Sequence, residues 1–453
     1  MTVPTRHRWI AGAALALAMT ATACSPGSDS GEGGGTETGA SDVATDVAEM
    51  GDVTLTVWDQ EVRGGQARQI EALNTAFQEE YPNVTIERVS RSFEDLRRTL
   101  RLAISGNEAP DVVQANNGRS DMGAFVSAGL LQSLDGYAEA YGWTERFPES
   151  VRALASYSDD GKEFGTGNLY GIAQVGEVVG VWYNKAALDR LGLQPPETFE
   201  EFEAALATAK EAGELPIQFG NLDQWPGIHE FGFVQNAFVN PEEIRTLGFG
   251  REGADWSTPE NEQAADTLTG WVESGYFPDG FNGLGYDPAW QQFAKGEGVF
   301  LVSGTWLLAD LQDPLGDDLG FMLSPEGASG ELAVTGGTGL PFSITEASEN
   351  ADVAAAYIDF ISSPDAMTGI TEAGNLPVVA AGEQQVSGAQ AEVFDAWETA
   401  TSQDALVPYL DYATPTFYDT LTAQVQDLMG GDTSTQDFLT TLQQDYVDFT
   451  GGS

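Results

Sequence analysis

Apolar and polar residues alternate with a period of two in some segments of this chain and recur at helical spacing in others. The first segment has the period of a strand and the second that of a helix. Residues 53–57 alternate apolar and polar side chains, a period of two that predicts a strand. Residues 66–80 instead place Ile70 and Phe77 on one helical face, and residues 84–89 return to alternation. A strand, a helix and a second strand in this order predict two parallel strands joined by a crossover helix.

Helical and extended patterns continue to alternate toward the C-terminus. Further helices are predicted over residues 93–104, 198–212, 288–293 and 352–362, from residue 364, and from residue 416 with a break at 430–431. Further extended segments are predicted at residues 111–114, 170–183 and 298–303. Because strands and helices alternate over about 400 residues, we expect an α/β fold with more than one lobe.

The N-terminal residues have the pattern of an export signal. Charged residues at positions 6–8 precede an apolar run over residues 9–19 and small residues at 21–23. The apolar run is shorter than the roughly 20 residues that span a bilayer. Cys24, the only cysteine, follows directly, and the arrangement resembles the lipobox of bacterial lipoproteins, although Ala21 stands where Leu is usual. The resemblance implies a signal peptide over residues 1–23 and a lipidated Cys24; an exported protein with a stray cysteine is the alternative.

The residues after Cys24 predict a tether. Residues 25–48 are rich in Ser, Gly, Thr, Glu and Asp and contain no aromatic side chain. Such a segment buries too little apolar surface to offset the entropy of ordering it. We therefore expect residues 24–50 to be disordered and the folded part to begin at Gly51.

Charge and rare residues exclude several functions. The formal net charge is −51, from 70 acidic residues against 19 Lys and Arg, which argues against nucleic acid, anionic lipid or phosphorylated ligands. Without the signal peptide, His229 is the only histidine. A Cys/His zinc site or a cysteine nucleophile then lacks its residues, and we interpret His229 as a surface or supporting residue. The sequence predicts no metal and no cofactor.

Nine short motifs together carry a family resemblance. In order they are Leu55–Trp58, Ala109–Val113, Leu169–Ala173, Val181–Lys185, Pro195–Phe199, Phe293–Val299, Ser303–Trp306, Ile361–Asp365 and Gly374–Pro377. This order resembles the extracellular solute-binding proteins of ABC importers, the group that includes maltodextrin-binding protein, from residue 53 to about 449.

The resemblance implies a two-lobed α/β periplasmic-binding-protein fold with a ligand cleft between the lobes. Three crossovers are expected, near residues 174–177, 324–327 and 373–378. Lobe 1 is then expected to hold residues 51–175 and 325–375, and lobe 2 residues 176–324 and 376–453.

Candidate ligand-binding residues follow predicted strands. Aromatic faces stack on the C–H faces of sugar rings, while planar polar side chains pair with hydroxyl groups. Ligands of open α/β sheets bind beyond the carboxyl ends of the strands. The candidates placed this way are Trp58, Asp59, Glu61, Arg63, Asn116 and Asn117. Core packing of Trp58 and a simple turn at the two asparagines are the alternatives.

Further candidates combine local pattern with the resemblance. Trp306 follows a predicted strand and Gly304, and it matches a stacking Trp of the family. Glu177 lies at the first expected crossover and matches a ligand-contacting acid. The remaining candidates, for which packing or turn geometry is an equal alternative, are Asn221, Trp225, Gly337 and Tyr418.

Together these features predict a monomeric, lipid-anchored binding protein at the outer face of a bacterial cell membrane. It would capture a carbohydrate, an oligosaccharide, by hinge closure. The resemblance implies that it delivers the sugar to ABC permease subunits driven by a cytoplasmic ATPase, and that it is not an enzyme. The alternatives are a lipid-anchored glycosidase, which needs two carboxylates about 5–10 Å apart, a sugar-sensing subunit without transport, and a binding protein for a non-sugar ligand.

Overall fold

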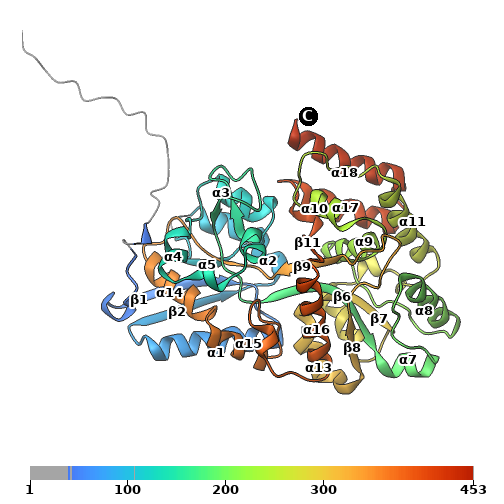
Figure 1. The fold of residues 1–453 in the computed structure, drawn as a ribbon, viewed down its shortest axis with the longest axis horizontal. Helices are drawn as coiled ribbons and strands as arrows, with labels where there is room; N and C mark the ends of the chain where they lie inside the picture. The colour runs from blue at the N-terminus through green and yellow to red at the C-terminus, as the bar shows by residue number, and fades with distance from the viewer. Residues whose placement is uncertain (1–38, 41–42, 107, 452–453) are drawn as a thin grey trace, which may run out of the picture. The chain divides into compact units, whose positions relative to one another are not determined.

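The computed structural model describes residues 39–40, 43–106 and 108–451 (Figure 1). The predicted signal peptide and Cys24 lie outside these residues. The predicted end of the tether is wrong, because Val47 in the short helix η2 (Val47–Glu49) is only 1% exposed. Asn83 also donates a hydrogen bond from Nδ2 to the Val47 carbonyl oxygen at 2.8 Å. The fold therefore includes residues upstream of Gly51.

The first sheet has the strand order β10-β3-β1-β2. Its strands are β1 (Val53–Asp59), β2 (Val84–Ser90), β3 (Val112–Gln114) and β10 (Phe342–Ile344). β1 pairs in parallel with both β2 and β3, while β10 pairs antiparallel with β3. Helix α1 (Gly64–Glu80) joins β1 to β2, which confirms the predicted crossover. Its apolar face buries Ile70 and Phe77.

The second sheet is built around β6 (Gly176–Asn184), whose nine residues are all buried. Its other strands are β7 (Phe300–Gly304), β8 (Leu319–Met322), β9 (Val334–Thr338) and β11 (Leu406–Val407). β6 pairs antiparallel with β7, β8 and β9, and β11 pairs in parallel with β9. The pair β4 (Ser156–Tyr157) and β5 (Asn168–Leu169) forms a separate two-stranded sheet.

Helices cover the sheets (Figure 1). Those after α1 are α2 (Phe93–Ile104), α3 (Ala124–Ser127), α4 (Asp135–Ala140), α5 (Trp143–Arg146), α6 (Glu149–Arg152), α7 (Lys185–Leu191), α8 (Phe199–Glu211), α9 (Trp225–Phe238), α10 (Pro241–Gly248), α11 (Pro259–Glu273), α12 (Tyr286–Phe293), α13 (Leu308–Leu315), α14 (Ala351–Ile361), α15 (Pro364–Glu372), α16 (Ala389–Ser402), α17 (Phe417–Gly430) and α18 (Thr435–Thr450). α1 packs against α14 and α15, and α14 packs against β10. α9 packs against β7 and β9, and both α11 and α17 pack against α9. None of the helices in the described part of the chain has the length and apolarity of a membrane span.

Local sequence signals set several helix ends. The side chain of Thr198 accepts a hydrogen bond from the Glu201 backbone N–H at 3.2 Å, which is the predicted N-cap of α8. In a standard capping box the Glu201 side chain would accept from the N–H of the N-cap Thr198. Here its carboxylate accepts from the Glu197 N–H instead, at 2.9 Å. Gly431 ends α17 in the left-handed conformation, at the predicted break.

The chain passes between the two sheets three times, and one passage differs from the prediction. The first and third passages lie side by side, since Gly176 N donates to the Leu376 carbonyl oxygen at 3.0 Å. The second passage lies at residues 339–341, between β9 and β10, and not at 324–327. Glu326 bridges to Thr198, and β9 extends the second sheet along β6. The predicted lobe boundary at residue 325 is therefore wrong, because residues 326–338 pack with the second sheet.

Candidate ligand-binding site

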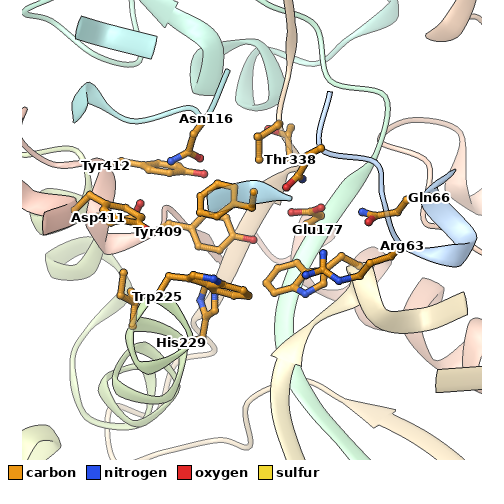
Figure 2. Close-up of a pocket in the computed structure, with 16 residues that line it drawn as sticks. Arg63, Gln66, Asn116, Glu177, Trp225, His229, Thr338, Tyr409, Asp411 and Tyr412 are labelled. Atoms are coloured by element: carbon orange, nitrogen blue, oxygen red, sulfur yellow. The ribbon is translucent and has the colours of Figure 1, made fainter. Parts of the chain in front are cut away.

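A cavity with about 650 Å³ of empty volume is lined by elements of both sheets (Figure 2). The side chains on the first-sheet side are Gln60, Arg63, Gln66, Phe93 and Asn116. Those from the second sheet, its helices and the second passage are Glu177, Trp225, Ile228, His229, Trp306, Thr338, Leu340, Tyr409, Asp411, Tyr412 and Tyr418.

One wall of the cavity is a cluster of aromatic rings from three separate segments. Trp225 begins α9, and its ring centroid lies 5.4 Å from that of His229 and 6.2 Å from that of Trp306. His229 also lies 5.4 Å from Trp306 and 5.7 Å from Tyr409. Because these rings pack on one another, their remaining faces form a rigid apolar surface for a ligand.

The position of Trp306 is set by its hydrogen bond and by Gly304. Trp306 follows β7 in the short helix η6 (Thr305–Leu307), and its Nε1 donates to the Tyr286 hydroxyl at 2.5 Å. That hydroxyl lies 2.8 Å from the Ser303 Oγ. A Cβ added to Gly304 would lie 1.9 Å from Cζ3 of the indole. Trp306 can therefore fold back over the end of β7 only because residue 304 has no side chain.

A second aromatic group lies where α2 meets α17. The Phe93 ring lies 6.1 Å from Trp225 and 6.4 Å from Tyr418. The Tyr418 hydroxyl donates to Oε1 of Glu94 at 2.9 Å, and the Arg97 guanidinium lies 3.6 Å from the Tyr418 ring centroid. Contacts between these helices thus join residues of both halves at the cavity.

Glu177 and Arg63 are the charged residues at the first-passage side of the cavity. Glu177 is 7% exposed, and burial raises the pKa of its carboxyl to about 8, with the charge of Glu61 adding to the rise and that of Arg63 opposing it. No described residue donates a hydrogen bond to this carboxylate. Nη2 of Arg63 lies 3.2 Å from Oδ1 of Asp287, and the Arg63 guanidinium lies 5.3 Å from the Tyr286 ring centroid.

Two further titratable groups face the cavity from the second-sheet side. Burial raises the pKa of Asp411 to about 7; its own backbone N–H and the charge of Arg97 oppose the rise, and Asp121 adds to it. Burial lowers the pKa of His229 to about 3, so its imidazole is neutral at physiological pH. The interpretation of His229 as a surface or supporting residue was wrong, because the ring is part of the cavity wall.

Several buried polar atoms of the wall have no hydrogen-bond partner among the described residues. They are Nε of Arg63, Oε1 of Gln66, Nδ1 of His229 and the hydroxyl of Tyr409. Buried polar atoms are nearly always paired in folded proteins, and unpaired ones call for an explanation. Here they give an aromatic cavity a set of fixed hydrogen-bonding positions.

The structure brings together about half of the predicted binding residues. Those that line the cavity are Arg63, Asn116, Glu177, Trp225, Trp306 and Tyr418. Trp58 does not: it packs against the core with the Arg91 guanidinium 4.7 Å from its ring centroid. Asp59 is fully buried and binds Arg88 through two hydrogen bonds of 2.6 and 2.7 Å. Glu61 lies behind the wall, accepting from Gln114 at 2.7 Å.

Three other predicted residues make structural contacts near the cavity but do not line it. Asn117 is fully buried and donates to the Leu154 carbonyl oxygen at 2.7 Å. Asn221 accepts from the Gly227 N–H at 2.9 Å in the first turn of α9. Gly337 is a paired residue of β9, where an added Cβ would lie 2.4 Å from Cδ1 of Leu154. None of these three residues lines the cavity, and each is used in local structure.

Sequence reasoning missed the other lining residues, most of which come from helices or from segments without a clear strand pattern. They are Gln60, Gln66, Phe93, Ile228, His229, Thr338, Leu340, Tyr409, Asp411 and Tyr412. The available signal was the run Tyr409-Leu-Asp-Tyr412, two aromatic residues and an acid directly after the short strand β11. Within the described residues, no group of three or more His, Cys, Asp or Glu is arranged to hold a metal ion.

The chain matches known proteins in sequence and in structure. The sequence model described as "Bacterial extracellular solute-binding protein" matches residues 63–368. A "Probable sugar-binding periplasmic protein" of Mesorhizobium japonicum is 26% identical over 182 residues, covering 40% of this chain and 41% of that protein. The "Multiple sugar-binding protein" of Streptococcus mutans is 21% identical over 324 residues, covering 68% of this chain and 71% of its own.

Solved structures share the fold. A "Chitin oligosaccharide binding protein" superposes with a TM-score of 0.74 at 20% identity, covering 88% of this chain and 99% of its own. The GacH receptor of Streptomyces glaucescens, solved unliganded and in complex with acarbose, gives a TM-score of 0.69 at 20% identity over 88% of this chain and 98% of its own. The α/β fold built on two sheets is thus that of the two-lobed periplasmic solute-binding proteins, as predicted.

Proposed function

Because this chain belongs to the family of bacterial extracellular solute-binding proteins, we propose that it captures a carbohydrate for an ABC importer. The cavity wall is the observation that carries the proposal. It combines exposed indole and phenol faces with buried polar atoms that lack a protein partner. Relatives named as sugar-binding proteins support the same ligand class.

The wall offers the two kinds of contact that a sugar needs. The C–H faces of a pyranose ring pack on Trp306 and Trp225, an apolar contact. The hydroxyl groups pair with Glu177, Arg63 and Gln66, whose planar side chains fix the orientation of the ring. Since the wall offers several aromatic rings besides its polar groups, the proposed ligand is an oligosaccharide.

Capture is proposed to proceed by hinge closure. The first and third passages lie side by side at Gly176 and Leu376, and the second lies at residues 339–341. Three short connections of this kind allow two lobes to rotate while each keeps its own sheet. A ligand that contacts both sets of cavity residues favours the closed arrangement, because only there are all its contacts made.

The proposal extends to location and delivery. Lipidation of Cys24, which lies outside the described residues, would hold the monomeric protein at the outer face of the cell membrane. The closed form would then dock on permease subunits coupled to a cytoplasmic ATPase. Changing Cys24 to Ser should release the protein from the membrane fraction while sugar affinity stays the same. Continued retention of the variant in that fraction would refute the anchor.

A glycosidase is the second candidate, and one observation favours it. Glu177 and Asp411 are two buried carboxyl groups in one cavity with raised pKa values, the property expected of an acid catalyst. The relatives, in contrast, are binding proteins. If both acids serve binding, the sugar must leave the protein chemically unchanged.

A single experiment tests both candidates. The protein from Ser25 onward is screened by thermal shift against mono- and oligosaccharides, and each ligand that raises the melting temperature is recovered and analysed. Saturation at about 100 times the dissociation constant should stabilise the protein by about 2.7 kcal/mol. An intact sugar supports the binding protein, a cleaved sugar the glycosidase, and no stabilisation by any sugar overturns the carbohydrate proposal.

A further inference from the structure

Two buried carboxyl groups of the cavity have no cation of the protein to neutralise them. Glu177 is 7% exposed and Asp411 is 6% exposed. Among the described residues, neither takes part in an ion pair, and the hydrogen bond of Asp411 is to its own backbone N–H. Burying an unpaired carboxylate is costly, and buried charges in proteins are normally paired or neutralised.

The hydroxyl of Tyr409 lies in the field of both acids. After burial, the charge of Glu177 and then that of Asp411 raise the pKa of Tyr409. Figure 2 shows Tyr409 between the two, with its hydroxyl directed toward Glu177. Tyr409 is 7% exposed, and its hydroxyl has no partner among the described residues. The unpaired Tyr409 hydroxyl thus lies beside the unpaired carboxyl of Glu177, with Asp411 on its other side.

The nearest cations of the protein are already engaged. Arg63 faces Glu177 but pairs with Asp287, and Glu61 lies on the same side as a further acid. Arg97 faces Asp411, yet its Nε bonds Oδ2 of Asp121 at 2.9 Å. In the ligand-free protein these acids are kept neutral by protonation, and a cation that pairs with the ionised carboxylate of Glu177 would come with the ligand.

The rings around this region suit a cation as well as a sugar face. Tyr409 and Tyr412 have ring centroids 5.3 Å apart, and Trp225 and Trp306 close the opposite side. A cation within about 6 Å of an aromatic face is attracted to it, by roughly 0.5–2 kcal/mol, more when water is excluded. The chain as a whole carries a net charge of −51, which favours the approach of cations.

We infer that the ligand carries a basic nitrogen, as an amino sugar or imino sugar does, and that Glu177 holds this nitrogen beside Tyr409. The inference rests on the proposed function, since it specifies the class of carbohydrate bound in the same cavity. Neutral sugars would satisfy the hydroxyl and amide groups of the wall but would leave Glu177 protonated and without a cation.

The inference predicts a linkage between binding and protons. Burial raises the pKa of Glu177 to about 8 and that of Asp411 to about 7, so both acids hold a proton part of the time near neutral pH. An ammonium group binds the ionised form of Glu177 and displaces its proton into the buffer. His229 stays neutral and Tyr409 protonated throughout, so neither contributes. Release of one proton tightens binding by up to about tenfold for each pH unit.

The test uses pairs of sugars that differ only in the nitrogen. Glucose oligosaccharides, their glucosamine counterparts and the N-acetylated forms share a β-1,4 backbone; galactose with galactosamine, and imino sugars with their parent sugars, extend the panel. Calorimetry measures each affinity between about pH 5.5 and pH 7. The amine member is expected to bind at least about tenfold more tightly than its neutral partners, as one charge-assisted contact allows. Its affinity should rise with pH, while that of the neutral partner changes less than about twofold.

Substitutions of single acids test which carboxyl group causes the preference for amine over neutral sugars. Glu177→Gln should reduce the ratio of amine to neutral affinity to below about threefold, whereas Glu243→Gln, an exposed acid on α10, should leave it unchanged. If a variant does not fold, proton release by the wild-type protein, measured in buffers of different ionisation enthalpy, still decides the matter. Neutral sugars that bind as tightly as amines, or no proton release, would overturn the inference alone. Failure of every sugar, amine or neutral, would overturn the proposed function with it.

Discussion

The carboxyl of Glu177 should make the ligand-free protein less stable as the pH rises. Its pKa in the folded protein is about 8, raised from the ordinary 4.5 by burial. A group whose folded pKa is raised contributes stability that is fully present below the unfolded pKa and is lost as the pH rises through the folded pKa. The window for this residue therefore runs from about pH 4.5 to pH 8.

The size of the effect follows from the shift. Each pH unit within the window changes the free energy of unfolding by about 1.4 kcal/mol. Between about pH 5.5 and pH 8 the loss amounts to about 3 kcal/mol, because the slope flattens near the folded pKa. Glu177→Gln keeps the shape of the side chain and cannot ionise, so it should remove this loss. Glu61 behaves in the same direction, and its charge acts on Glu177, so the two residues titrate as a pair.

The measurement is urea unfolding of the wild-type and Glu177→Gln proteins at matched pH values without sugar. Other carboxyl groups titrate too, so the decisive quantity is the difference between the two curves. The variant should gain about 3 kcal/mol relative to wild type between about pH 5.5 and pH 8. Glu243→Gln, on the exposed face of α10, provides the control and should parallel wild type. If Glu177→Gln also parallels wild type, the carboxyl is not held in a desolvating cavity wall, and the reasoning fails.

Two further substitutions separate binding from folding. Trp306→Ala should weaken sugar binding by about 2 kcal/mol or more, roughly 30-fold, because it removes a stacking face at the centre of the site. Trp58→Ala is its matched control, and calorimetry should find its affinity within about threefold of wild type; equal losses in both variants would contradict the assignment of the two rings. Asn221→Ala should lower the free energy of unfolding by about 1–3 kcal/mol, because it leaves the Gly227 N–H without its acceptor. A variant with wild-type stability in urea that had lost sugar binding would instead restore Asn221 as a ligand contact.

The elements that sequence reasoning predicts well are those with a local cause. Helix α2 spans the predicted residues 93–104, since its apolar side chains recur at helical spacing after the N-cap Ser92. The parallel pairing of β1 and β2 follows from the crossover helix between them. The second passage was misplaced because β9, with the sequence Val-Thr-Gly-Gly-Thr, has no clear period and owes its place to pairing with β6.

The residues of the candidate site depend even more than the strands and helices on contacts that no local sequence pattern predicts. Arg63 and Asn116 could be predicted because the ends of parallel neighbouring strands meet at one edge of a sheet. Tyr409, Asp411 and Tyr412 reach the cavity from a segment more than 200 residues after β6. The aromatic and acidic run that contains them does not by itself show that the chain returns to this site. Asp59 resembles a ligand-binding acid in sequence, yet it is fully buried and paired with Arg88 on the neighbouring strand. Cross-strand partners of this kind are visible only once the register is known.

The contrast between Trp58 and Trp306 has a local cause that can be tested. Trp58 is a paired residue of β1, whereas Trp306 follows β7. Only Trp306 is preceded by a glycine two residues earlier, and its indole occupies the space that a side chain at Gly304 would fill. Gly304 has an ordinary extended φ of −84°, so the backbone conformation itself accepts alanine. The only obstacle is the clash between the added Cβ and the indole of Trp306. Gly304→Ala should therefore displace the indole and weaken sugar binding by about as much as Trp306→Ala. In the double variant the two losses should not add, because both act through one ring. Additive losses in that cycle would show that Gly304 acts on the site through something other than Trp306.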